Sequence, residues 1–134
     1  IPFKIFSSLI KNTQFKFVSL QKSKDKEIFK AYGMKKFFVA AQDEISSSLD
    51  FLDTAAIIQK CNLVITSDTC VAHLAGAMGK KTWLLLKKNP DWRWGNFGDE
   101  SFWYPSLRLF RQSQASNWHQ VIDKVKEELQ KEFG

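Results

Sequence analysis

Cysteine is scarce in this chain of 134 residues. There are two, Cys61 and Cys70, and neither belongs to a Cys-x-x-Cys pair or to a Cys/His set with the spacing of metal ligands. The usual zinc-site patterns are therefore excluded, and we expect no bound metal. A reducing cytoplasm is the simplest setting for so few cysteines.

Long apolar runs are also missing. The longest are far shorter than the roughly 20 residues that span a bilayer, and no charged-then-apolar leader opens the chain. These absences predict a soluble protein. The chain begins at Ile1 rather than Met, so we expect it to be a piece of a longer protein.

The composition is that of a globular protein, with 44% hydrophobic and 25% charged residues. The length suits one domain over residues 1–134, and no internal repeat or linker divides it. The net charge of +6 favours anionic partners. Charge alone does not choose between phosphates, nucleic acid and a membrane surface.

Strand-like and helix-like segments alternate along the chain. The strand-like segments are residues 15–20, 37–40, 63–66, 82–86 and 107–110. Helix-like segments cover residues 23–32, 50–59 and 69–78 and the C-terminal stretch from Trp118 to Phe133, and a loop is expected at 46–48. Strands separated by helices predict an α/β fold, with a mostly parallel sheet of about five strands and helices on both faces.

The transition from strand to helix at residues 63–79 is the most informative part of the chain. Ser67 or Asp68 is expected at the N-cap, followed by Thr69 and Cys70 in the first turn and His73 one turn later. In one interpretation the helix end is capped and His73 is hydrogen-bonded locally. In the other, the amides of Thr69 and Cys70 face the crevice and bind an anion such as phosphate.

The sequence Asp68-Thr69, three residues, then His73-Leu74, after an apolar strand, resembles the nucleotide-sugar motif of glycosyltransferase family 9, the heptosyltransferases. A longer set is similar to the glycosyltransferase-like C-terminal domain of bacterial tetratricopeptide-repeat proteins. It comprises residues 17–22, 50–56, 68–77, 83–86, 91–94 and 103–112. The resemblance extends from about residue 15 to 121.

This resemblance implies the Rossmann-like C-terminal half of a GT-B glycosyltransferase, which binds a nucleotide-diphosphate sugar as donor substrate. The amides of Thr69 and Cys70 would hold the diphosphate, Asp68 would face the donor sugar, and His73 would steady that corner. Transfer in the family is metal-independent. The acceptor site and the catalytic base would come from an N-terminal domain, so no catalytic residue is assigned here.

Further candidate donor contacts lie at the ends of other elements. Gln21 and Lys22 end the first strand-like segment, and Lys22 either adds a charge to the phosphates or is a solvated lysine at the start of a charged helix. Asp53 either caps its helix or reaches the nucleotide, with Thr54 beside it. Ser67 precedes the motif's aspartate at the same edge.

Residues 87–105 are rich in aromatics and lack an obvious regular structure, which is often functional in a compact domain. Trp92 and its neighbouring tryptophans either stack on a base or sugar, with Arg93 near phosphate, or pack onto the sheet. In the packed alternative, Arg93 pairs with Asp91 or Asp99.

Two other functions stay open from the sequence. A basic nucleic-acid-binding domain would use the net positive charge, although the lysines are dispersed among acidic residues. A non-catalytic protein-interaction domain would use the apolar loop aromatics as its interface.

Overall fold

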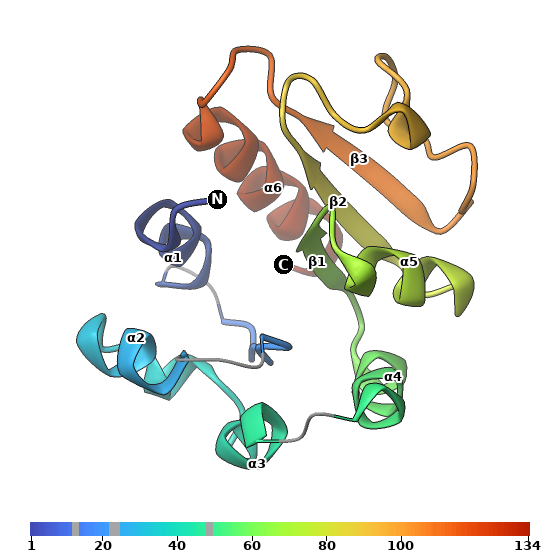
Figure 1. Cartoon of the computed structure of the whole chain (residues 1–134). Helices are drawn as coiled ribbons and strands as arrows, with labels where there is room; N and C mark the ends of the chain where they lie inside the picture. Colours follow the sequence, from blue (N-terminus) through green and yellow to red (C-terminus); the bar gives the residue numbers. More distant parts are fainter. Residues whose placement is uncertain (12–13, 22–24, 48–49) are drawn as a thin grey trace.

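The computed structural model describes residues 1–11, 14–21, 25–47 and 50–134. Its centre is a three-stranded parallel sheet of β1 (Val64–Ser67), β2 (Thr82–Leu86) and β3 (Leu107–Arg111), in the order β1-β2-β3 (Figure 1). Every residue of the central strand is buried, because neighbours cover both its edges and both its faces. The predicted parallel sheet is confirmed for these three segments.

One face of the sheet packs against two helices from opposite ends of the chain. Trp83, Leu85 and Phe110 form an apolar cluster with the buried side chains of α6 (Trp118–Phe133) and with Leu9 of α1 (Phe3–Lys11). The regular apolar spacing of α6 therefore has the expected effect of directing one helix face onto the sheet.

The opposite face carries α5 (Cys70–Ala77) and part of the connection between β2 and β3. Leu84 and Leu86 pack there against Ala72 and Trp94. Figure 1 shows α5 and α6 on opposite sides of the sheet. Alternate residues of β2 thus face different helices, which confirms the prediction of helices on both faces.

Two of the five expected strands are absent from the sheet within the described residues. Residues 15–20 and 37–40 make only an isolated parallel bridge between Phe17 and Phe38. These two rings lie in a separate apolar cluster with Ile10 and Met34, and η1 (Lys35–Phe37) occupies the first position of the second segment. The strand count is therefore three rather than about five.

The helices before the sheet agree in part with expectation. α2 (Asp25–Ala31) lies within the expected helix, and Gly33 follows it with φ +61°. The loop expected at residues 46–48 is wrong for its first two positions, because α3 (Gln42–Ser47) extends through them. The Gln42 side chain donates to Ser46 Oγ at 2.9 Å and so supports this helix. The third position of that loop lies outside the described residues.

The remaining helices are α1, which was not expected, and α4 (Phe51–Lys60). Asp50 is the N-cap of α4, where its carboxylate accepts from Leu52 N at 2.7 Å. No helix in the described part of the chain is both long and apolar enough to cross a membrane.

Candidate functional site

The start of α5 lies at the carboxyl end of β1. Ser67 is still paired with Leu85 in the sheet, Thr69 is the extended N-cap residue with φ −139°, and the helix begins at Cys70. The expectation that Ser67 or Asp68 is the N-cap is therefore wrong. The helix starts later because the strand holds Ser67 in its ladder.

This helix end is open. Within the described part of the chain, no side chain caps it, and Thr69 Oγ1 lies 3.2 Å from Thr66 Oγ1 instead. The first intrahelical bond runs from Ala72 N to Thr69 O at 3.0 Å, so the amides of Cys70 and Val71 precede it and have no acceptor within the helix. Thr69 and Cys70 are exposed. Two amide donors thus have no partner within the helix, and the positive end of the helix dipole lies beside exposed residues.

His73 lies one turn further along α5 and is held by aromatic side chains. Its Nδ1 is 3.1 Å from the Tyr104 hydroxyl, and its ring stacks on Trp94 with centroids 5.3 Å apart and planes at 30°. His73 is thus hydrogen-bonded, although to a residue 31 positions away rather than locally as one interpretation predicted. The capped helix end of that interpretation is wrong, because no side chain of the described residues caps α5.

Gly76 lets the aromatic corner of His73, Trp94 and Tyr104 approach α5 closely. A Cβ at this glycine would lie 2.5 Å from Tyr104 Cγ, far inside contact distance. Gly76 thus permits a close approach that a residue with a side chain would prevent. The ring of Tyr104 lies where any larger residue would place its side chain.

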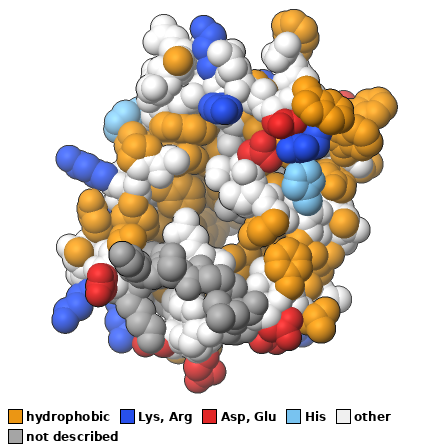
Figure 2. All heavy atoms as spheres, viewed as in Figure 1, with side chains coloured by type: hydrophobic (Ala, Val, Ile, Leu, Met, Phe, Trp, Pro, Cys, Tyr) orange, Lys and Arg blue, Asp and Glu red, His pale blue; other side chains and the backbone are white. Residues whose placement is uncertain are grey.

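The tryptophans and the tyrosine of the β2–β3 connection divide into two pairs. Trp94 is buried and Tyr104 half-buried, whereas Trp92 is 76% and Trp103 50% exposed. The exposed pair meets edge to face at 6.4 Å, and Trp103 Nε1 donates to Arg93 O at 3.0 Å. Figure 2 shows hydrophobic side chains gathered over the region that carries η2 (Trp92–Trp94) in Figure 1. The packed alternative is therefore correct for one pair only.

Arg93 is paired as one alternative predicted. Its guanidinium lies 3.3 Å from Asp91 Oδ2, and its amide donates to Asp91 Oδ1 at 3.1 Å. Asp99, the other expected partner, lies 3.6 Å from Arg108 instead. The positive charge of Arg93 is thus partly balanced before any ligand binds.

Gln21 is exposed, and its backbone N–H donates to Ser19 Oγ at 3.3 Å. It follows Leu20, which packs against the apolar cluster that contains Ala75 of α5. Lys22, the other candidate here, lies outside the described residues. The structure therefore brings the chain near α5 at Leu20 and leaves the expected charge at position 22 a prediction.

Asp53 and Thr54 lie in the first turn of α4. Thr54 is buried, and its hydroxyl donates to Asp50 O at 3.3 Å, so the hydroxyl is used within its own helix. Because Asp50 is the cap, the interpretation of Asp53 as the cap is wrong. Asp53 is exposed three residues into the helix.

Two lysines at this edge were missed from the sequence. Lys87 and Lys88 directly follow β2 and are exposed. Carboxyl ends of neighbouring parallel strands meet at one edge of the sheet, which is where α/β folds bind ligands. A pair of polar residues directly after an apolar strand-like segment would have identified these lysines from the sequence. The same pattern identified Gln21 and Lys22.

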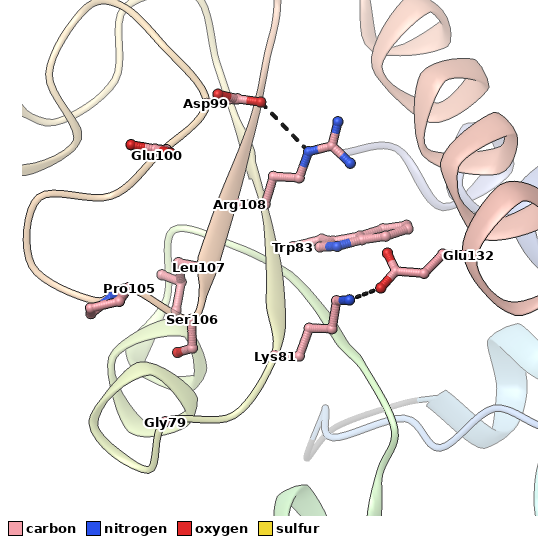
Figure 3. Close-up of a pocket in the computed structure, with 10 residues that line it drawn as sticks. All are labelled: Gly79, Lys81, Trp83, Asp99, Glu100, Pro105, Ser106, Leu107, Arg108 and Glu132. Atoms are coloured by element: carbon pink, nitrogen blue, oxygen red, sulfur yellow. Dashed lines mark ion pairs between the residues drawn. The ribbon is translucent and has the colours of Figure 1, made fainter.

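A hollow of about 490 Å³ lies at the opposite, amino end of the strands (Figure 3). Trp83 forms part of its wall, and its two basic residues are already paired, Lys81 with Glu132 and Arg108 with Asp99. With both cations balanced, this hollow lacks the free donors found at α5. The open helix end is the better candidate site.

Comparison with known proteins gives matches over most of the chain. A family model described as glycosyltransferase family 9 (heptosyltransferase) matches residues 4–102, which include β1, α5 and η2. The protein FlbA of Caulobacter vibrioides is 28% identical over 126 residues, an alignment that covers 92% of this chain and 21% of FlbA. The chain thus spans about a fifth of that relative's length.

Proposed function

The chain belongs to glycosyltransferase family 9, and from this premise we propose that it binds a nucleotide-diphosphate sugar as the donor half of a metal-independent GT-B glycosyltransferase. The observation that carries the proposal is the open N-terminus of α5 at the carboxyl edge of a parallel sheet. Such an edge is the usual ligand position in open α/β sheets.

The diphosphate is the part of the donor that this helix end suits. The amides of Cys70 and Val71 offer two fixed donors, and the helix dipole adds roughly half a positive charge. When the bond between the sugar and the diphosphate breaks, negative charge grows on the leaving oxygen. Dipoles already aimed at that oxygen stabilise the transition state without reorganising. This contribution needs no metal ion.

The other parts of the donor have candidate contacts on both sides of this helix end. Asp68 is exposed just before the helix and would face the sugar, as the family motif implies. Trp92 and Trp103 present exposed rings for stacking on a base or sugar. Lys87 and Lys88 would add positive charge near the phosphates.

We further propose that the complete enzyme is longer than this domain. The acceptor site and general base would come from an N-terminal domain or a repeat domain, in the same chain or in a partner. The likeness to the C-terminal domain of tetratricopeptide-repeat proteins supports a repeat domain. The fraction of FlbA that this chain spans supports a longer protein in general.

A single pair of variants tests the phosphate contact. Proline suits position 70, because it is the first residue of the helix and because Thr69 before it is extended. Cys70→Pro removes one amide donor, whereas Cys70→Ala keeps the amide and removes only the thiol. Calorimetric titration with UDP, GDP and ADP and their sugars would measure the affinity of each form.

We expect the wild type and Cys70→Ala to bind at least one of these nucleotides equally well. Cys70→Pro should weaken that binding by about tenfold or more, since a hydrogen bond to a charged group contributes about 1.5–3 kcal/mol. If both variants bind the nucleotide equally well, the backbone amide of Cys70 does not contact the ligand. Failure of the wild type to bind any nucleotide would reject the donor-binding function.

A further inference from the structure

We propose that Arg111 positions the aromatic part of the donor site, an inference that rests on the donor-binding function proposed above. Arg111 is the last residue of β3 and lies on the sheet face that carries α5. It does not need to touch the ligand for this role. Its side chain instead fixes residues 94–98, the backbone between Trp92 and Trp103.

The guanidinium of Arg111 binds four backbone carbonyls of one short segment. Nε donates to Gly98 O at 2.7 Å and Nη1 to Gly95 O at 2.8 Å. Nη2 donates to Phe97 O at 3.2 Å and also to Trp94 O. Residues 94–98 are thus wrapped around a single planar cation with donors in a rigid fork.

The backbone of this segment is built for that wrapping. Gly95 and Gly98 have φ values of +61° and +77°, in the left-handed region that favours glycine. Among the described residues, Arg111 has only carbonyl partners and no carboxylate. Burial lowers the pKa of Arg111 from its ordinary value, and the carbonyl dipoles replace the missing counter-ion.

The next residue holds the beginning of the same connection. Gln112 Oε1 accepts from Lys88 N at 3.2 Å, and Gln112 N donates to Leu86 O at 3.0 Å. The end of β3 therefore fixes the connection at its start through Gln112 and at residues 94–98 through Arg111. The intervening η2, which carries Trp92 and Arg93, is held between these two attachments.

Fixing this segment matters because an ordered loop binds more tightly than one that must be ordered on binding. The carbonyl of Trp94 ends η2, so its bond to Arg111 sets the direction of Trp92 two residues earlier. The amides at the start of α5 directly follow β1, whereas the connection contacts α5 at His73, one turn further along the helix. Loss of the Arg111 bonds should therefore affect base or sugar contacts and spare phosphate contacts.

Arg111→Lys tests this inference, because it keeps the charge but cannot reproduce the four-carbonyl fork. Arg108→Lys is the matched control in the same strand, since Arg108 binds no loop carbonyl and pairs with the carboxylates of Glu128 and Asp99, which a lysine can also do. Two measurements are needed for each variant. One is the rate of trypsin cleavage after Lys87, Lys88 and Arg93. The other is the affinity for inorganic pyrophosphate and for the best nucleoside diphosphate.

For Arg111→Lys we expect loop cleavage several times faster than in the wild type. Affinity for the nucleoside diphosphate should fall by about tenfold, with pyrophosphate affinity changed less than about twofold. Arg108→Lys should change none of these quantities. Unchanged cleavage in Arg111→Lys, or an equal loss for both ligands, would overturn the inference.

The proposed function and this inference fail in different ways. If the wild type binds neither pyrophosphate nor any nucleoside diphosphate, the donor-binding function is rejected. The cleavage comparison then still decides whether Arg111 holds the connection. If the wild type binds both ligands and Arg111→Lys binds both as tightly, only the inference is rejected.

Discussion

Replacing Gly76 by alanine should displace Tyr104 and break its contact with His73. The added Cβ would lie 2.5 Å from Tyr104 Cγ and 2.8 Å from both neighbouring ring carbons. These atoms form the base of the ring, so rotation of a flexible chain end cannot relieve the overlap. Either the ring or α5 must move, and the 3.1 Å bond between Tyr104 and His73 is lost.

Two opposing effects set the size of the change. Alanine in place of glycine within a helix stabilises by about 0.5–1 kcal/mol. Overpacking at a tight contact destabilises by about 1–3 kcal/mol. The overlap should prevail, and the free energy of unfolding of Gly76→Ala should fall by about 0.5–2 kcal/mol.

The sign of the effect should reverse when the ring is removed. In a Tyr104→Ala background the overlap disappears, so Gly76→Ala should stabilise the protein by about 0.5–1 kcal/mol. Urea denaturation of the four proteins forms a double-mutant cycle that isolates the contact.

Gly79→Ala is the matched control for this cycle. Its φ of +66° strains alanine, but no atom lies within 4 Å of the added Cβ. The control should therefore destabilise equally in both backgrounds. If Gly76→Ala has the same effect with and without the Tyr104 ring, the close contact that we describe does not exist in solution.

Two other predictions follow from the charges and thiols. Burial raises the pKa of Cys61 from its ordinary value of 9.0, while Cys70 is exposed. Iodoacetamide should therefore modify Cys70 before Cys61, and a bound nucleoside diphosphate should slow the modification of Cys70. Mass spectrometry measures the rate at each thiol, and equal rates at Cys61 and Cys70 would contradict the first expectation. Hydrogen bonds from Arg108 and Lys131 lower the pKa of Glu128 below its ordinary value of 4.5. The ionised Glu128 carboxylate therefore stabilises the fold above pH 4.5, and this contribution is lost as the pH falls through its folded-state pKa. The stability lost in Arg108→Gln should accordingly be larger in denaturation at neutral pH than at about pH 3, and a constant difference would refute this.

The core of the fold was predictable because its signals are local. An uninterrupted apolar run marks β2, and spacings of three and four mark α6. Residues 15–20 have similar strand propensity but form only one bridge. Pairing depends on a neighbouring strand, and strand propensity alone does not provide one. The helix α1 packs against α6 at the other end of the chain. It was missed although Phe3, Phe6 and Ile10 recur at helical spacing.

The candidate site was predictable to the same extent. Asp68, Thr69 and Cys70 follow the apolar start of a strand, so the sequence indicated a helix start here, although it placed the N-cap too early. The bond from His73 to Tyr104 joins residues 31 positions apart. It depends on the path of the β2–β3 connection, which has little regular structure and no periodic signal. The carbonyl partners of Arg111 were not predictable for the same reason.

Parallel strands are usually joined by a helix that covers one face of the sheet. Between β2 and β3 a loop with one short 3-10 helix, η2, covers part of that face instead. A helix opens by breaking a cooperative ladder, whereas this cover is held by separate bonds to Arg111 and Gln112 and by the buried ring of Trp94. The half of this face under α5 should thus exchange its amide hydrogens slowly, and the half under the loop quickly. α5 and the connection meet at the ring of His73. A molecule bound beside this ring would contact a rigid helix on one side and a more easily opened loop on the other.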